Sequence, residues 1–118
     1  MRLPADADEW WVFDATMNRQ QYLHQTLEGY CATPTASGRV SPADRDLAVR
    51  LYQEKIPLTA VEGAFILAAA RRTYRRGPHP LAPIRSLRYF LPIIREILAQ
   101  PVDPGHVSYL WLRMQGRL

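Results

Sequence analysis

The sequence predicts an all-α protein, a compact bundle of about five helices with a Pro-rich linker between the third and fourth helices. Three observations support this fold class. Apolar residues recur three or four positions apart in every long segment, which is helical spacing. No segment alternates polar and apolar residues as a half-buried strand does. Pro and Gly cluster between the apolar segments, where helices end.

The chain has 118 residues, 47% of them hydrophobic, and this size predicts a single domain over residues 1–118 with a genuine core. The single cysteine, Cys31, makes an internal disulfide impossible. No apolar run approaches the roughly 20 residues of a membrane helix, and the first residues do not resemble a signal peptide. We therefore expect a soluble, cytoplasmic protein with no membrane partner.

Residues 6–33 form the first predicted segment, an acidic helical one, because they lack Pro and carry acids at their start. We expect one long helix or two helices joined near Asn18, followed by a loop over residues 34–40. Trp10 and Trp11 point to different faces of a helix, so one is exposed unless a partner covers it. Both are therefore candidates for a protein interface.

Residues 41–76 predict a helix pair. The first helix of the pair begins at Ser41–Asp44, with Ser as the N-cap, Pro at the first helical position and an acid three residues after the cap. The pattern of Thr59–Glu62 is that of a capping box, which opens the second helix of the pair. Every residue from 64 to 70 is apolar, so this helix is expected to be central and mostly buried.

The remaining residues predict a linker and two basic C-terminal helices. Residues 77–83 hold three Pro and one Gly, which suit neither a helix nor a central strand. Within residues 84–116, apolar spacing predicts one helix over 85–99 and a shorter one over 107–114. Pro92 is expected to kink the longer helix or to mark a restart.

The net charge of +4 conceals an uneven distribution. The net charge is −3 over residues 1–38, zero over 39–70, +6 over 71–100 and +1 over 101–118, and 14 of the 15 basic residues are Arg. Two interpretations follow. The basic segment meets an external polyanion, or the acidic N-terminal segment pairs with it, within one chain or between two chains.

Cations interleaved with aromatic residues are typical of a groove that follows a nucleic-acid backbone and stacks its bases. Arg suits this task because its planar fork matches phosphate oxygens. The alternative is a solvated helix end whose cations complement the helix dipole. The candidate nucleic-acid-binding residues are Arg71, Arg72, Tyr74, Arg75, Arg76, Arg85, Arg88, Tyr89 and Arg95.

Other kinds of site find little support. A helix-turn-helix reader exposes polar residues at the start of its recognition helix, whereas the helix after Pro57 soon turns apolar. The His and Cys residues are scattered, with no spacing that suits a metal. His24 and Cys31 lie two helical turns apart, too far for a nucleophile and its base. We expect no metal, no cofactor and no enzymatic activity.

Residues 56–65, Arg71 with Arg72, and residues 83–91 form a pattern of a helix pair followed by a basic stretch and an Ile-Arg helix with a Tyr. Through this pattern, residues 44–100 resemble the C-terminal modules of bacterial replication initiators and DnaD-like primosome proteins. It implies DNA binding and self-association. Arg85, Arg88 and Tyr89 would take the DNA role, with the preceding Arg residues as neighbours.

Two functions remain open from the sequence. The first is a non-enzymatic protein that binds single- or double-stranded DNA, in replication or in a mobile genetic element, as a homo-oligomer or with a replication protein as partner. The second is an adaptor that self-associates through its acidic, Trp-containing N-terminal segment and its basic segment.

Overall fold

The computed structural model describes residues 11–34, 36–75, 77, 81–101 and 103–116. These residues form five α-helices and a short 3-10 helix, and the described ranges hold no strand beyond an isolated bridge between Ala36 and Ile84. The all-α prediction is confirmed. The helices are α1 (Arg19–Ala32), α2 (Pro42–Gln53), α3 (Leu58–Thr73), η2 (Leu87–Phe90), α4 (Leu91–Ala99) and α5 (Pro104–Met114).

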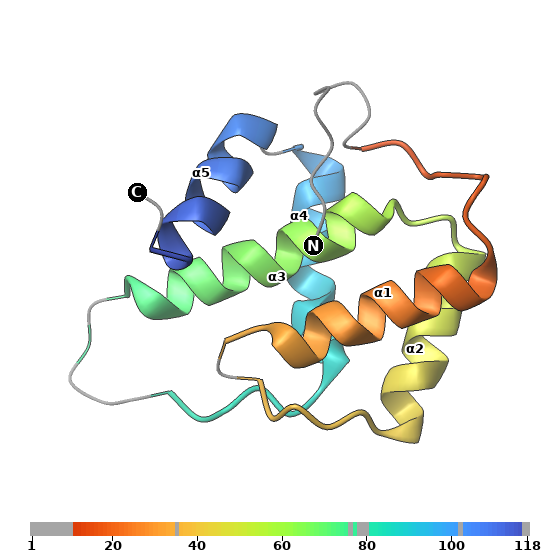
Figure 1. Ribbon diagram of the computed structural model, residues 1–118, viewed down its shortest axis with the longest axis horizontal. Coiled ribbons are helices and arrows are strands. Elements are labelled where there is room, and N and C mark those ends of the chain that lie inside the picture. The colour runs from red at the N-terminus through yellow and green to blue at the C-terminus, as the bar shows by residue number, and fades with distance from the viewer. Residues whose placement is uncertain (1–10, 35, 76, 78–80, 102, 117–118) are drawn as a thin grey trace.

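Helix α3 is the centre of the fold. Every residue from 60 to 70 is buried, as the uniform apolar run predicted. α1, α4 and α5 all pack against α3, and Figure 1 shows α3 crossing the middle of the molecule with α4 behind it. α2 packs against α1. A helix with no wet face is stable only when neighbours surround it in this way.

The first helix is shorter than predicted. α1 begins at Arg19, after Asn18, whose side chain accepts a hydrogen bond from the backbone of Gln21. The predicted helix is wrong over residues 11–17, where Asp14 accepts hydrogen bonds from the backbone and hydroxyl of Thr16. Such local side-chain bonds compete with helix formation. Residues 6–10 of the prediction lie outside the described residues.

The predicted start of α2 is confirmed. Ser41 is the N-cap, Pro42 follows it, and the Ser41 and Asp44 side chains each accept from the backbone N–H of the other. Asp44 is also buried, with 2% of its surface exposed, and its second oxygen accepts a hydrogen bond from the backbone of Leu87 at 2.9 Å. One side chain thus caps α2 and fixes η2 to it.

The predicted capping box of α3 is wrong. α3 begins at Leu58, one residue before the expected cap, and Pro57 occupies the cap position with no side-chain hydrogen bond. The hydroxyl of Thr59 has no hydrogen-bond partner among the described residues. Glu62, the other half of the pattern, is buried. Tertiary packing of the first turn overrides the local pattern here.

The fourth predicted helix is divided. Ser86 caps the 3-10 helix η2, and the α-helical part restarts at Leu91 with Pro92 in its first turn. This confirms the restart at Pro92, where the missing N–H costs nothing. The fifth predicted helix is confirmed as α5. No helix within the described ranges has the length and apolar character that a membrane span requires.

Candidate nucleic-acid interface

The C-terminal end of α3 is where the central helix reaches the surface. Residues 60–70 of α3 are buried, and Arg71 is exposed. Side chains from η2, α4 and α5 meet this end of α3 through the contacts described below. Residues far apart in the sequence therefore gather at one end of the central helix.

Arg71 forms a bidentate ion pair. Its two guanidinium nitrogens donate to the two carboxylate oxygens of Glu96 on α4, at 3.1 and 2.6 Å. The hydrogen bonds raise the pKa of Arg71, and the same bonds lower the pKa of Glu96. Glu96 is the one acid of the basic segment, so Arg71 neutralises it and is itself neutralised.

Arg72 ties the end of α3 to the residues before η2. It is half-buried, donates a short hydrogen bond to the carbonyl of Ala82, and lies over the ring of Tyr89 with its central carbon 5.8 Å from the ring centre. Tyr89 packs its edge against Phe90 and leaves 44% of its surface exposed. The Tyr89 ring is therefore exposed and contacts both Arg72 and Phe90.

A second stack joins α5 to the end of α3. The guanidinium carbon of Arg113 lies 4.4 Å from the centre of the Tyr74 ring, within the range of a cation–π contact. Tyr74 is 43% exposed. Sequence reasoning did not single out Arg113, since nothing local connects it to a Tyr 39 positions earlier.

Three of the predicted Arg residues, Arg85, Arg88 and Arg95, are exposed and form no salt bridge with any described residue. Arg85 lies two residues before η2, and Arg88 lies within η2 beside Tyr89. Arg75 is exposed as well. The predicted Arg76 lies outside the described residues. Some of the predicted Arg residues thus form intramolecular contacts, whereas these three have no acidic partner among the described residues.

The acids that could cover this region were expected in the N-terminal segment. The described salt bridges are His24–Glu28 within α1 and Arg71–Glu96. The acid that meets the basic segment therefore comes from that segment itself, in the part of the chain that is described. Asp6, Asp8 and Glu9 lie outside the described residues.

Trp11 packs against its own chain. Its ring lies within 4 Å of the position that a side chain at Gly63 of α3 would occupy, and it is half-buried against the core. Trp10, the other predicted interface residue, lies outside the described residues. Trp11 therefore packs within the fold of its own chain.

The helix pair α2–α3 does not present a recognition helix. The first turns of α3 are covered, since residues 60–63 are buried and Thr59 is half-buried. A helix that enters the major groove exposes its N-terminal side chains to base edges. Across the described ranges no three His, Cys, Asp or Glu side chains are grouped as metal ligands.

Comparisons of the chain with protein-family models, with curated proteins and with solved structures find no match.

Proposed function

We propose that this protein is a non-enzymatic DNA-binding protein that contacts the phosphate backbone through Arg85, Arg88 and Arg95. Tyr89 supplies a stacking surface beside them. The proposal places the chain in the cytoplasm, in replication or in a mobile genetic element, as the resemblance to replication initiators and primosome proteins implies. Sequence-specific readout is not part of the proposal, because the start of α3 is buried.

One observation carries the proposal: three exposed Arg residues with no carboxylate partner among the described residues lie just before η2, in η2 and in α4, and η2 also carries the exposed ring of Tyr89, which a fourth Arg contacts. A folded protein gains little from unpaired surface cations. When such cations bind phosphates, the counterions of the nucleic acid are released, and this release favours binding. Arg71 is not among the proposed phosphate contacts, because both of its terminal guanidinium nitrogens donate hydrogen bonds to Glu96.

The first test is a salt titration of binding to single-stranded and duplex DNA of unrelated sequence. The logarithm of the affinity is expected to fall linearly with the logarithm of the salt concentration. Replacing Arg85, Arg88 and Arg95 together by Ala should reduce the slope by about 2 to 3, since each phosphate contact contributes about 0.7 to 0.9. Fluorescence anisotropy with labelled oligonucleotides measures both quantities.

A triple variant of equal charge change is the control. Arg19, Arg45 and Arg50 are exposed on α1 and α2. Replacing these three residues by Ala lowers the net charge by the same amount as the first triple variant. It should change the slope by less than the contribution of one phosphate contact, about 0.7 to 0.9. Equal losses in the two triple variants would show that only net charge matters, and no binding at low salt would refute DNA binding altogether.

Stacking by Tyr89 predicts a difference between the two forms of DNA. Tyr89→Leu should weaken binding to single-stranded DNA by about fivefold or more, because stacking of one base on an aromatic ring contributes about 1 kcal/mol or more. Duplex binding should change less, since its bases are already stacked. Tyr109→Leu is the matched control, because Tyr109 is an equally exposed ring on α5. If Tyr89→Leu weakened binding to single-stranded and duplex DNA equally, Tyr89 would not stack on a base.

A further inference from the structure

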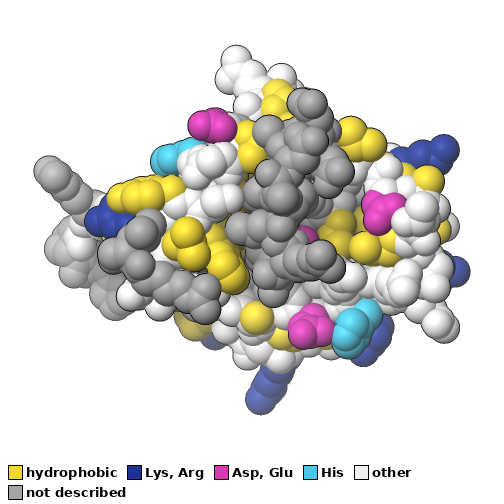
Figure 2. Space-filling view, turned by 45° about the horizontal axis from the view of Figure 1, so that its top comes forward, with side chains coloured by type: hydrophobic (Ala, Val, Ile, Leu, Met, Phe, Trp, Pro, Cys, Tyr) yellow, Lys and Arg dark blue, Asp and Glu magenta, His cyan; other side chains and the backbone are white. Residues whose placement is uncertain are grey.

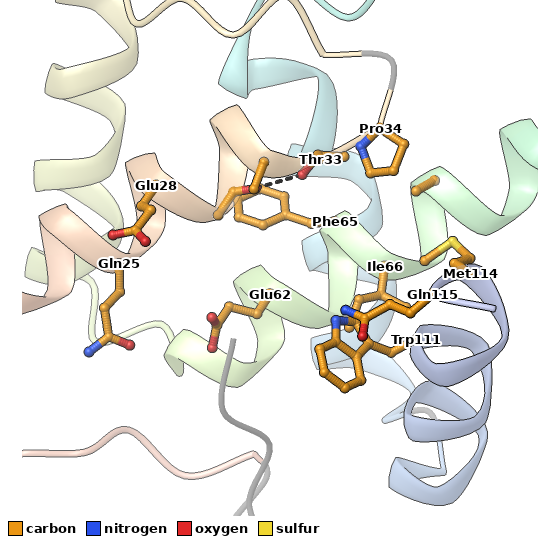
Figure 3. Close-up of a pocket in the computed structure, with 13 residues that line it drawn as sticks. Gln25, Glu28, Thr33, Pro34, Glu62, Phe65, Ile66, Trp111, Met114 and Gln115 are labelled. Atoms are coloured by element: carbon orange, nitrogen blue, oxygen red, sulfur yellow. Dashed lines mark hydrogen bonds between the residues drawn. The ribbon is translucent and has the colours of Figure 1, made fainter. Parts of the chain in front are cut away.

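A cavity of about 600 Å³ lies between α1, α3 and α5 (Figure 3). Phe65 and Ile66 of α3 form its floor, and Trp111 and Met114 line it from α5. Its volume falls within the roughly 300–1,000 Å³ of small-molecule sites. The cavity is separate from the exposed Arg residues of the proposed DNA interface, none of which lines it.

The cavity has an unusual charge for this chain. Two carboxylates, Glu28 and Glu62, line it, and none of its described lining residues is Lys or Arg, although the chain carries 15 of them. In Figure 2 the visible Lys and Arg side chains lie towards the edge of the face, whereas hydrophobic side chains are spread across it. The cavity is thus acidic and apolar in a basic protein.

Glu62 is the buried member of the pair. It is 7% exposed, and Figure 3 shows its carboxyl group pointing from α3 towards the side of the cavity that Gln25 and Glu28 of α1 line. Burial raises the pKa of Glu62 to about 7, and the positive charge of the chain's amino terminus opposes this rise. A carboxylate in apolar surroundings is costly unless a positive charge meets it.

Besides the amino terminus, the charged and titratable groups near Glu62 among the described residues come from α1. Glu28 lies at the exposed side of the cavity, with an oxygen 2.8 Å from His24. Tyr22 is buried, and burial followed by the charge of Glu62 raises its pKa. The described lining residues of α5, Trp111, Met114 and Gln115, carry no charge. The cavity therefore favours a cation and repels an anion.

We propose that this cavity binds a small organic cation with an apolar body. Its ammonium group meets the carboxylate of Glu62, and its body packs on Phe65 and Ile66. The ring of Trp111 adds a cation–π contact, which is strongest for Trp among the aromatic side chains. A neutral ligand of the same shape gains the apolar contact and leaves the carboxylate unpaired. The site is independent of DNA binding, so either proposal stands or falls alone.

The test compares two probes of nearly the same shape, 3-phenylpropylammonium and 3-phenylpropan-1-ol, by NMR titration of the full chain at pH 8. The ammonium is expected to bind about tenfold or more tightly than the alcohol, since a desolvated ion pair exceeds about 1.4 kcal/mol. Glu62→Gln should reduce this preference to less than about threefold and leave the alcohol affinity unchanged. Glu54→Gln, at an exposed Glu after α2, should keep the preference.

The pH dependence gives a second readout. An amine of this kind stays charged between pH 5 and 8, whereas Glu62 becomes protonated below its pKa of about 7. The ammonium affinity should therefore fall by about tenfold or more between pH 8 and pH 5, and the alcohol affinity should not. Equal binding of both probes, equal ammonium binding by wild type and Glu62→Gln, or no ammonium binding would each overturn the proposal.

Discussion

Replacing Asp44 with Ala is expected to lower the free energy of unfolding by about 3 kcal/mol. The carboxylate accepts one hydrogen bond from the backbone of Ser41 and one from the backbone of Leu87, and it is 2% exposed. Each charge-assisted bond contributes about 1.5 to 3 kcal/mol, and the Leu87 N–H would be left buried without an acceptor. The loss therefore affects both the start of α2 and the position of η2.

Urea denaturation at pH 7 measures this effect. Asp44→Asn should cost less than Asp44→Ala, because its single amide oxygen still accepts one of the two bonds. Asp46→Ala is the control, since Asp46 is exposed on the same helix and its replacement should cost no more than about 0.5 kcal/mol. If Asp44→Ala were as stable as Asp46→Ala, the link between α2 and η2 would contribute nothing.

Glu62→Gln is expected to stabilise the protein at pH 8 and to have little effect at pH 5. Burial raises the pKa of Glu62 from its ordinary 4.5 to about 7, so the folded state binds this proton more tightly than the unfolded state. The contribution of Glu62 to stability is therefore most favourable below about pH 4.5, falls as the pH rises and levels off above about pH 7. The difference between the two pKa values corresponds to about 3 kcal/mol.

The uncharged amide avoids this cost, so the variant should gain up to about 3 kcal/mol over wild type at pH 8. Thermal unfolding followed by circular dichroism at pH 5, 6, 7 and 8 measures the growing difference in Tm. Glu54→Gln should show a small difference that does not grow with pH over this range, because Glu54 is exposed. A constant difference between wild type and Glu62→Gln across the range would mean that Glu62 is not buried as a carboxyl group.

Asp44 shows what the sequence reveals of a residue and what it does not. Its place three residues after Ser41 predicts the capping box, because that pattern is complete within four neighbouring residues. Its bond to Leu87 spans 43 positions, and no local pattern connects the two residues. The carboxyl group is buried because it also accepts this hydrogen bond from Leu87.

The basic segment shows the same division. Its Arg residues and the exposed Tyr89 stand out in the sequence by composition. The selection among them depends on distant contacts, because Glu96 holds Arg71, Ala82 and Tyr89 hold Arg72, and Arg113 lies on Tyr74. The sequence therefore predicts a basic site, and within the described residues the structure shows that Arg85, Arg88 and Arg95 have no acidic partner.

The sequence by itself determined the all-α class, the central position of α3 and the start of α2, because each depends on residues within one or two helical turns. For Pro92 the sequence predicts either a kink or a restart, and the structure shows the restart, at Leu91. Only the tertiary structure decided where α3 begins, which Arg residues remain unpaired, and that Glu62 lies in an acidic cavity between three helices. The Thr59–Glu62 pattern predicts a cap, yet the first turns of α3 are buried, with Gly63 facing Ile97 of α4 and Trp11, and this burial gives Glu62 a different environment. Local rules hold where a segment satisfies its own hydrogen bonds, and they fail where packing against distant helices contributes more free energy.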